Sequence, residues 1–347
     1  MEFVEVDGSE GEGGGQILRS AVAFSAIQHR PVRVTQIRAG RGVPGLKRQH
    51  LAALRILATV FEAELTGAAE GSSEITFAPG DRRRGNLSIG MGTAASITLV
   101  LQAVVPAVAL TGSSLRLDLE GGTDVPWSPT LDYFGRVVRE AYRSMGIVFE
   151  VTAQRRGYYP RGGGRVSALI EPCASIIPLG PDAGKAASEA AVVSRCGSLP
   201  RHVADRQLSS ASEALVRAGY APNGTETTVE SSDSPGSSVL VYHCAPGAFL
   251  GADAIGSRGR PAEEVGRDAA TRFVKDAGSG AMVDANLGDM IIPLLSLASG
   301  PSEVSVPSVT PHLESGLHLA EKFTGCRWSV RRKERRSVVR VDPTGRG

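Results

Sequence analysis

One pattern recurs along this chain and limits its fold more than any other feature: a turn containing glycine that leads directly into a long apolar stretch. Turns at 13–15, 90–92 and 286–288 precede predicted helices at 16–27, 93–110 and 289–297. A fourth predicted helix, residues 45–62, carries apolar residues at helical spacing. Runs rich in strand-forming residues lie between the helices, at 32–37, 74–77, 114–119, 147–151 and 166–170. This alternation predicts an α/β (α+β) fold of repeated βα units, with helices packed on sheets.

The spacing of these units indicates an insertion. The first two predicted helices start about 80 residues apart, whereas the second and third start nearly 200 residues apart. The surplus, roughly 100 residues, is enough for a small domain. It falls where the composition shifts toward Ser, Ala and Gly. We therefore predict a discontinuous larger domain, residues 1–180 and 278–347, interrupted by a smaller inserted α/β domain, residues 181–277.

Two N-terminal segments, residues 7–19 and 38–50, combine glycines with basic side chains and run into predicted helices. Between residues 30 and 50 there are six Lys or Arg residues and no acidic residue, in a chain whose net charge is +2. Helix N-termini and clustered guanidinium groups both favour phosphate. The segments lack the Gly-Lys-Ser/Thr ending of a P-loop and do not fit GxGxxG. They therefore predict a phosphate site of another kind, which grips a nucleotide or one end of a strand.

Eight segments point to a known family: 7–20, 37–51, 89–106, 121–129, 156–164, 199–204, 289–297 and 312–323. In residues and in order they resemble the RNA 3′-terminal phosphate cyclase family, and together they span nearly the whole chain. The resemblance implies a larger domain of repeated α/β units with a smaller inserted domain. This agrees with the spacing of the predicted helices.

The resemblance also implies a reaction and a nucleophile. In this family a histidine near the C-terminus attacks the α-phosphate of ATP, and AMP then passes to the RNA 3′-phosphate. The neighbouring 2′-OH attacks, AMP leaves and a 2′,3′-cyclic phosphate remains. His312 stands at the position of that histidine, and a neutral imidazole can attack at physiological pH. His318, six residues downstream, is the rival candidate, for which we expect a surface or packing role.

Other site residues are implied in the same way. Glu12 matches a glutamate that supports a divalent metal, Mg²⁺ or Mn²⁺, beside ATP. Asp289 matches a residue near the nucleotide and also fits a helix N-cap, and Gln102 matches a residue facing the nucleotide. The other residues expected to bind ATP or RNA phosphates are Arg19, Arg38, Arg41, Lys47, Arg48, Gln49 and His50. Many members carry Thr-Asn shortly after the histidine, where this chain has Ser315-Gly316.

Two main classes of function remain open from the sequence, and a third, a small-molecule transferase with similar repeated α/β units, is weaker because the motifs resemble those of the cyclases. The first is an ATP-dependent, ligase-type cyclase that acts through histidyl-AMP and RNA-adenylate, with ATP and RNA bearing a 3′-phosphate as partners. The alternative is a non-catalytic cyclase-like RNA-binding protein of ribosome maturation, a class that lacks the histidine. Glu12 and His312 favour the enzyme. A basic-then-apolar leader and a full membrane span are not evident, so we expect a cytoplasmic protein without membrane contact.

Three aromatic residues, Trp127, Tyr158 and Tyr159, flank loops rich in glycine and proline. Aromatic side chains in such places can stack on an RNA base or on adenine. We expect at least two of the three to pack in the core instead.

Overall fold

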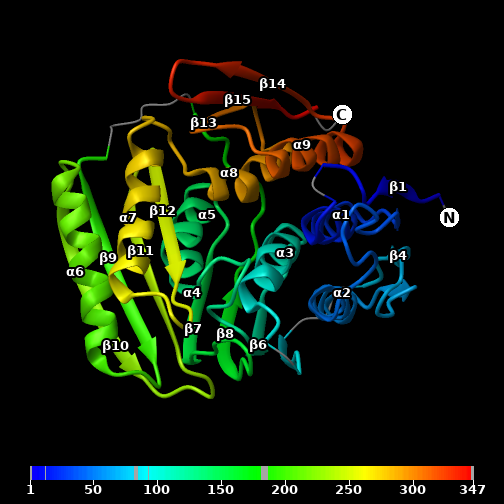
Figure 1. Ribbon diagram of the computed structural model, residues 1–347. Helices are drawn as coiled ribbons and strands as arrows, with labels where there is room; N and C mark the ends of the chain where they lie inside the picture. Colours follow the sequence, from blue (N-terminus) through cyan, green and yellow to red (C-terminus); the bar gives the residue numbers. More distant parts are fainter. Residues whose placement is uncertain (1, 12, 82–84, 93, 181–186, 345–347) are drawn as a thin grey trace.

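The structure, a computed structural model, describes residues 2–11, 13–81, 85–92, 94–180 and 187–344. These residues form four sheets with helices packed on them, so the predicted α/β class is confirmed (Figure 1). Among the described residues, no helix combines the length and the apolar character needed to cross a membrane.

The N-terminal unit is a four-stranded sheet in the order β1-β2-β4-β3, with β1 parallel to β2 and the other pairs antiparallel. Its strands alternate as a half-buried sheet requires: Val4 and Val6 are buried, whereas Glu5 is exposed. Its elements are β1 (Val4–Asp7), α1 (Gly15–Gln28), β2 (Val32–Thr35), α2 (Arg48–Val60), β3 (Glu64–Thr66) and β4 (Ile75–Ala78).

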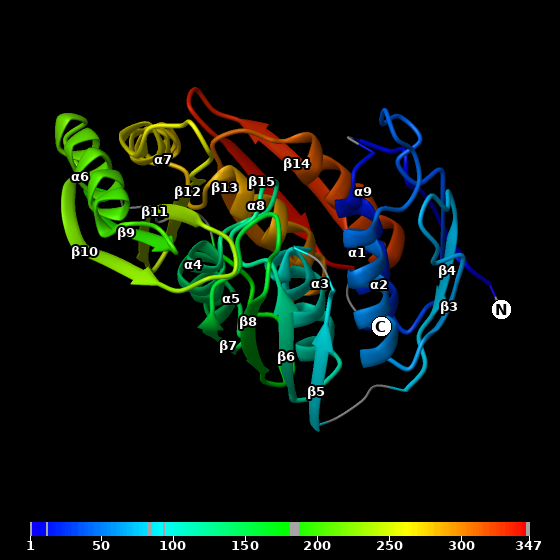
Figure 2. The same cartoon turned by 60° about the horizontal axis from the view of Figure 1, so that its bottom comes forward.

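A second unit repeats this topology. Its sheet has the order β5-β6-β8-β7, again with the first pair parallel and the rest antiparallel (Figure 2). The order of strands and helices along the chain also matches that of the first unit. Its elements are β5 (Gly85–Gly90), α3 (Ile97–Leu110), β6 (Leu115–Gly121), α4 (Leu131–Tyr133), the π-helical turn η1 (Phe134–Val138), α5 (Arg139–Ser144), β7 (Phe149–Arg155) and β8 (Gly164–Ile170).

The C-terminal unit follows the same succession of helix, strand, helix and two strands. Its three strands lie in the order β13-β15-β14, which corresponds to the last three strands of the other two sheets. Its elements are α8 (Ala285–Ile291), the 3₁₀ helix η2 (Ile292–Leu297), β13 (Ser302–Val306), α9 (Pro311–Thr324), β14 (Arg327–Arg332) and β15 (Ser337–Asp342). Among the described residues, three units thus share this succession. The predicted glycine turn at 286–288 is wrong, because these residues lie within α8, which begins at Ala285 and is capped by Asp284.

Between the second and third units lies a sheet of different topology, in the order β10-β9-β11-β12. Helices α6 and α7 contact each other and cover this sheet, and they enclose a hydrophobic cluster distinct from the main core. The elements are β9 (Glu189–Gly197), α6 (Arg201–Arg217), β10 (Ala221–Glu230), β11 (Gly236–Ala245), β12 (Ala248–Ile255) and α7 (Ala262–Ala277). They lie within the range 181–277 predicted as an inserted domain. Residues 181–186 lie outside the described residues, and the domain boundaries stay a prediction.

Three predicted helices differ from the observed ones at their boundaries. Helix α2 covers Arg48–Val60, a shorter range than the predicted 45–62. Helix α3 begins at Ile97 and not at residue 93, because the Ser96 hydroxyl accepts a hydrogen bond from the Leu99 amide (3.2 Å) and caps the helix there. The stretch 289–297 is not one helix: α8 begins earlier, at Ala285, and continues as the 3₁₀ helix η2. Pro293 has no amide hydrogen, so the α-helical hydrogen bonding cannot continue through it.

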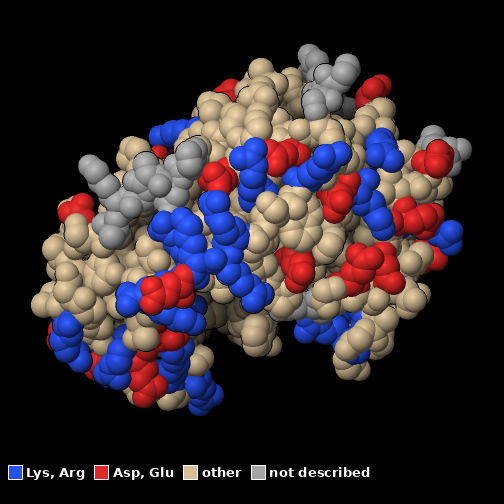
Figure 3. Space-filling view, turned by 90° about the horizontal axis from the view of Figure 1, so that it is seen from above, with Lys and Arg blue, Asp and Glu red and all other residues tan. Residues whose placement is uncertain are grey.

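A basic turn joins β14 to β15 at the surface. Arg331, Arg332, Lys333 and Arg335 are exposed there, beside the single acid Glu334. Figure 3 shows Lys and Arg side chains gathered on this face of the molecule. Arg331 is paired with Glu303 of β13 at 3.1 Å.

Candidate active site

A cleft of about 830 Å³ lies where α1, α3, α8 and α9 come together, and β12 and α7 line its other side. Its volume suits a nucleotide-sized ligand. Of the residues predicted for the site, the cleft brings together Arg19, Arg38, Arg41, His50, Gln102, Asp289 and His312. These residues come from segments nearly 300 positions apart in the sequence.

The N-terminus of α1 forms one wall of the cleft, and three basic side chains lie against it. A Cβ on Gly15 would come within 2.4 Å of His50 Nε2 and 3.1 Å of Arg19 Nη1, and one on Gly14 within 3.6 Å of Arg41 Nη2. A side chain at position 15 would therefore displace His50 from this approach. The amides at the start of a helix and neighbouring guanidinium groups both favour anions, so this wall carries the positive field that the sequence predicted. Burial lowers the pKa of Arg19 to about 10, so the side chain stays charged at neutral pH.

Arg38 has a structural contribution besides its place in the cleft. Its backbone is in the left-handed region (φ 55°), and its Nη1 donates to the carbonyl oxygens of Val43 (2.7 Å) and Gly45 (3.1 Å). Burial, and then the charge of Arg41, lower the pKa of Arg38. Arg38 therefore holds the loop that leads into α2 and also adds positive charge to the cleft.

His50 is buried and neutral at physiological pH. Its Nδ1 accepts a hydrogen bond from the Lys47 amide (3.2 Å), which caps α2 and places the proton of the neutral ring on Nε2, toward Gly15. Burial, together with the smaller effects of the charges of Arg19, Arg38 and Lys47, lowers the pKa of His50 to about 4. His50 therefore offers the cleft an uncharged N–H donor beside charged arginines.

This lowered pKa makes stability depend on pH. The folded pKa of about 4 lies below the ordinary value of 6.5, so the contribution of neutral His50 is complete above pH 6.5 and is lost as the pH falls toward 4. We expect a loss of up to about 1.4 kcal/mol per pH unit in that window. His50→Gln keeps an acceptor at this capping position and does not titrate. Urea unfolding at pH 7.5 and 4.5 should therefore show a smaller acid loss in the variant; equal losses would contradict the prediction.

His312 is the second residue of α9, half-buried at the cleft. Thr310 caps this helix by accepting from the Leu313 amide (2.9 Å) and donates its hydroxyl hydrogen to Asp289 Oδ1. Gln16 Nε2 of α1 lies 3.5 Å from the His312 carbonyl oxygen. Asp289 is thus not a helix N-cap, because α8 is capped by Asp284. Asp289 instead connects α8 to the turn that presents His312.

The Ser315-Gly316 pair fits the packing of α9. Ser315 Oγ donates to the Pro311 carbonyl oxygen (2.7 Å), and Gly11 approaches this hydroxyl so closely that a Cβ there would lie at 1.8 Å. A Cβ on Gly316 would come within 2.8 Å of Pro293 Cγ in η2. The glycine lets α9 lie close to η2 behind His312.

We expect Gly316→Ala to lower the free energy of unfolding by about 1 kcal/mol. The gain in helix propensity is at most about 1 kcal/mol, whereas crowding a packed contact costs roughly 1–3 kcal/mol. The urea midpoint measures the change, and adding Pro293→Ala should recover part of it by removing the ring. A more stable single variant would contradict the predicted contact.

Several predicted residues lie elsewhere. Lys47 and Arg48 are exposed and do not line the cleft, and Arg48 is paired with Glu70 at 3.2 Å. The Gln49 side chain and all of Glu12 lie outside the described residues. Of the three aromatic residues, only Tyr158 is buried, so the expectation that at least two pack in the core is wrong. The roles given to Lys47, Arg48, Gln49 and Glu12 stay predictions.

The sequence reasoning missed the far wall of the cleft. This wall includes Asp253 and Ile255 of β12, Arg260, and Asp268 and Arg272 of α7. Arg260 and Arg272 share Asp268, at 3.1 and 3.3 Å. No motif in the sequence marked these residues, because their relevance arises only from the packing of the inserted sheet against the second unit.

Tyr133 and Asp284 form a buried polar pair beneath the cleft. The Tyr133 hydroxyl donates to Asp284 Oδ1 (2.8 Å), and the amides of Leu287 (3.0 Å) and Gly251 (2.9 Å) donate to the same carboxyl group. Burial raises the pKa of Asp284 to about 7, against the effect of these three donors. The pair joins α4, α8 and β12 at the cleft floor.

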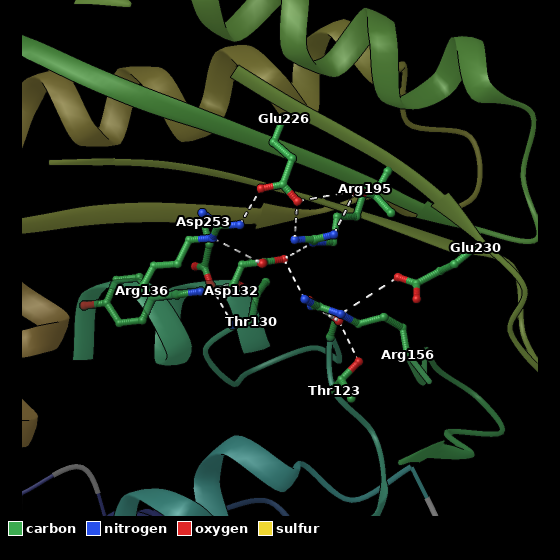
Figure 4. Close-up of polar contacts among 12 residues, drawn as sticks. Thr123, Thr130, Asp132, Arg136, Arg156, Arg195, Glu226, Glu230 and Asp253 are labelled. Carbon is green, nitrogen blue, oxygen red and sulfur yellow. Dashed lines mark hydrogen bonds and ion pairs between the residues drawn. The ribbon is translucent and has the colours of Figure 1, made fainter. Parts of the chain in front are cut away.

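A buried ion-pair cluster joins the inserted sheet to the second unit (Figure 4). Its centre is Asp132 of α4, which lies 3.0 Å from Arg156 Nη2, 2.7 Å from Arg195 Nε of β9 and 3.6 Å from Arg136 Nε. Arg195 also contacts Glu226 of β10 at 2.7 Å. The cluster fixes how the two sides of the cleft face each other.

The metal prediction has little support in the described side chains. Among them, no group of three or more His, Cys, Asp or Glu residues is arranged to hold a metal ion. Glu12, the predicted ligand, is not among the described residues. A role for Mg²⁺ or Mn²⁺ stays a prediction.

Comparison with known proteins identifies the family. The sequence model of the family described as RNA 3′-terminal phosphate cyclase matches residues 10–330. Curated proteins named RNA 3′-terminal phosphate cyclase are similar over nearly their full length. One from Thermococcus kodakarensis is 45% identical over 94% of each chain, and one from Methanopyrus kandleri is 42% identical over 99% of this chain and 100% of its own. The chain therefore belongs to the RNA 3′-terminal phosphate cyclase family.

Proposed function

We propose that this protein uses ATP to convert the 3′-phosphate of an RNA into a 2′,3′-cyclic phosphate. The observation that carries the proposal is the meeting of His312 with Arg19, Arg41 and the N-terminus of α1 in one nucleotide-sized cleft. A nucleophile stands there beside a wall suited to phosphates. Family membership supplies the reaction class.

In the first proposed step, the unprotonated ring nitrogen of His312 attacks the α-phosphorus of ATP. A P–N bond forms, the bond from that phosphorus to pyrophosphate breaks, and pyrophosphate leaves with the electron pair. Arg19, Arg41 and the amides at the start of α1 stabilise the charge that develops on the phosphates. The connection from Asp289 through Thr310 keeps the histidine oriented. The binding roles of Arg38, His50 and Gln102 belong to the same proposal.

The remaining steps transfer AMP and close the ring. An oxygen of the RNA 3′-phosphate attacks the adenylyl phosphorus, the P–N bond breaks and His312 is regenerated. The ribose 2′-oxygen then attacks the RNA phosphorus, AMP leaves with the electron pair and the hydroxyl proton is released. Catalysis rests on position and charge, because each step is an in-line displacement at phosphorus.

The test is conversion of a short RNA with a labelled 3′-phosphate, incubated with ATP and Mg²⁺ or Mn²⁺. We expect the label to become resistant to phosphatase, since a cyclic diester is not a phosphatase substrate, with one AMP released for each end closed. RNA ending in a 3′-hydroxyl is the control and should consume no ATP beyond the one molecule that labels each protein. Folded protein that binds the RNA without consuming ATP would instead support the non-catalytic RNA-binding class.

A further inference from the structure

Trp127 is a tryptophan almost wholly in solvent at the edge of the cleft that contains His312. Its side chain is 97% exposed, and the residue lines the cleft. Tryptophan is mostly buried in folded proteins, so an exposed indole at a cleft is informative. Its backbone lies in the left-handed region (φ 67°), which residues with a Cβ rarely adopt.

The exposure of Trp127 does not arise from a loose loop, because hydrogen bonds hold the loop on both sides. Ser128 Oγ donates to the Val125 carbonyl oxygen and Thr98 Oγ1 of α3 to that of Pro129, both at 2.8 Å. The Thr130 amide donates to Asp253 Oδ2 of β12 at 2.6 Å. The loop is thus fixed to both walls of the cleft, and it presents the indole outward in a defined place.

The other residues that line the cleft indicate which kind of ligand would contact the indole. The cleft that Trp127 lines also carries Arg19 and Arg41 beside the start of α1, so a ligand that reaches both places combines an anionic group with a flat ring. An RNA strand whose 3′-phosphate reaches His312 must leave the cleft across its open edge. ATP, a compact molecule, has no need to extend there. The position of Trp127 therefore favours a base of the RNA over the adenine of ATP.

We propose that the Trp127 indole stacks on an unpaired base within the last two nucleotides of the RNA substrate. This inference rests on the proposed function for the identity of the polymer. Such stacking makes the protein selective for single-stranded 3′ ends, because a base within a duplex has no free face for the indole. Stacking tolerates every base and needs no sequence-specific contact.

The test compares two 3′-phosphorylated RNAs, one normal and one without bases at its last two positions, on wild type, Trp127→Ala and Trp127→Phe. We expect Trp127→Ala to bind the normal RNA roughly 5- to 150-fold more weakly, as expected for loss of one stack. Trp127→Phe should keep most of the affinity, and the baseless RNA should bind all three proteins alike. Tyr159→Ala is the matched control, because Tyr159 is 66% exposed and does not line the cleft.

Fluorescence gives an independent readout. The chain has two tryptophans, so Trp328→Phe leaves Trp127 as the single reporter, and the normal RNA should quench it more than the baseless RNA does. Equal weakening of both RNAs by Trp127→Ala would overturn the proposal. Two other results for Trp127→Ala would also overturn it. If the variant is no longer labelled by ATP in the absence of RNA, the indole contacts adenine. If the variant changes its oligomeric state, the indole contacts a second copy of the chain. Labelling by ATP is measured without RNA, so failure of the cyclase chemistry is distinguishable from failure of stacking.

Discussion

Replacement of His312 by alanine is expected to abolish the transfer of α-labelled AMP from ATP to the protein. His312 is proposed to form the bond to phosphorus, and removal of a nucleophile lowers the rate by at least about 1,000-fold. Purified protein is incubated with ATP labelled at the α-phosphate, and the label on the protein is counted. The bond should be labile to acid and stable to base, as expected for a P–N linkage.

The matched control is His318→Ala, on the same helix. His318 is exposed, lies 5.0 Å from the ring of Trp328 and does not line the cleft. This variant should be labelled like the wild type. Label that persists in His312→Ala and disappears in His318→Ala would reverse the assignment. Circular dichroism on both variants separates loss of chemistry from loss of fold.

Removal of the Asp132 carboxylate is expected to cause the largest loss of stability, about 3–5 kcal/mol. Asp132 is buried among Arg156, Arg195 and Arg136. Without its negative charge, these three arginines would keep their positive charges with fewer ion-pair partners. Burial would raise the pKa of Asp132, but these arginines outweigh it and hold the pKa below its ordinary value. The measurement is urea unfolding of Asp132→Asn, which keeps the shape of the side chain, beside Asp132→Ala.

The control for this prediction is an ion pair whose atoms are comparably close but whose side chains are exposed. Arg206 and Glu263 lie 2.5 Å apart, with side chains 48% and 40% exposed. Arg206→Ala should cost no more than about 1 kcal/mol. The lowered pKa of Asp132 adds a pH test: its contribution is present above the ordinary pKa and is lost as the pH falls below about 4. The difference between wild type and Asp132→Asn should therefore shrink in acid, and a difference independent of pH would contradict the ion-pair account.

The sequence predicted the repeated units because their signals are local. Strand β1 alternates buried and exposed side chains over a few residues, and the apolar stretch that forms α3 is likewise recognised from neighbouring residues. Boundaries were less accurate where a single side chain decides them, as with the Ser96 cap of α3 and with Pro293 after α8. The basic segments near the N-terminus likewise pointed to phosphate without knowledge of their neighbours.

The sequence by itself determined the α/β class, the repeat, the family and His312 as the candidate nucleophile. Only the tertiary structure decided that Asp289 connects to Thr310, that Arg260 and Arg272 face the same cleft as His312, and that Trp127 is exposed at its edge. The physical reason is the separation along the chain. Local patterns reflect backbone geometry and the burial of one face. A cleft between repeats and an inserted sheet depends on long-range packing and on the buried cluster around Asp132, which leave no periodic trace in the sequence.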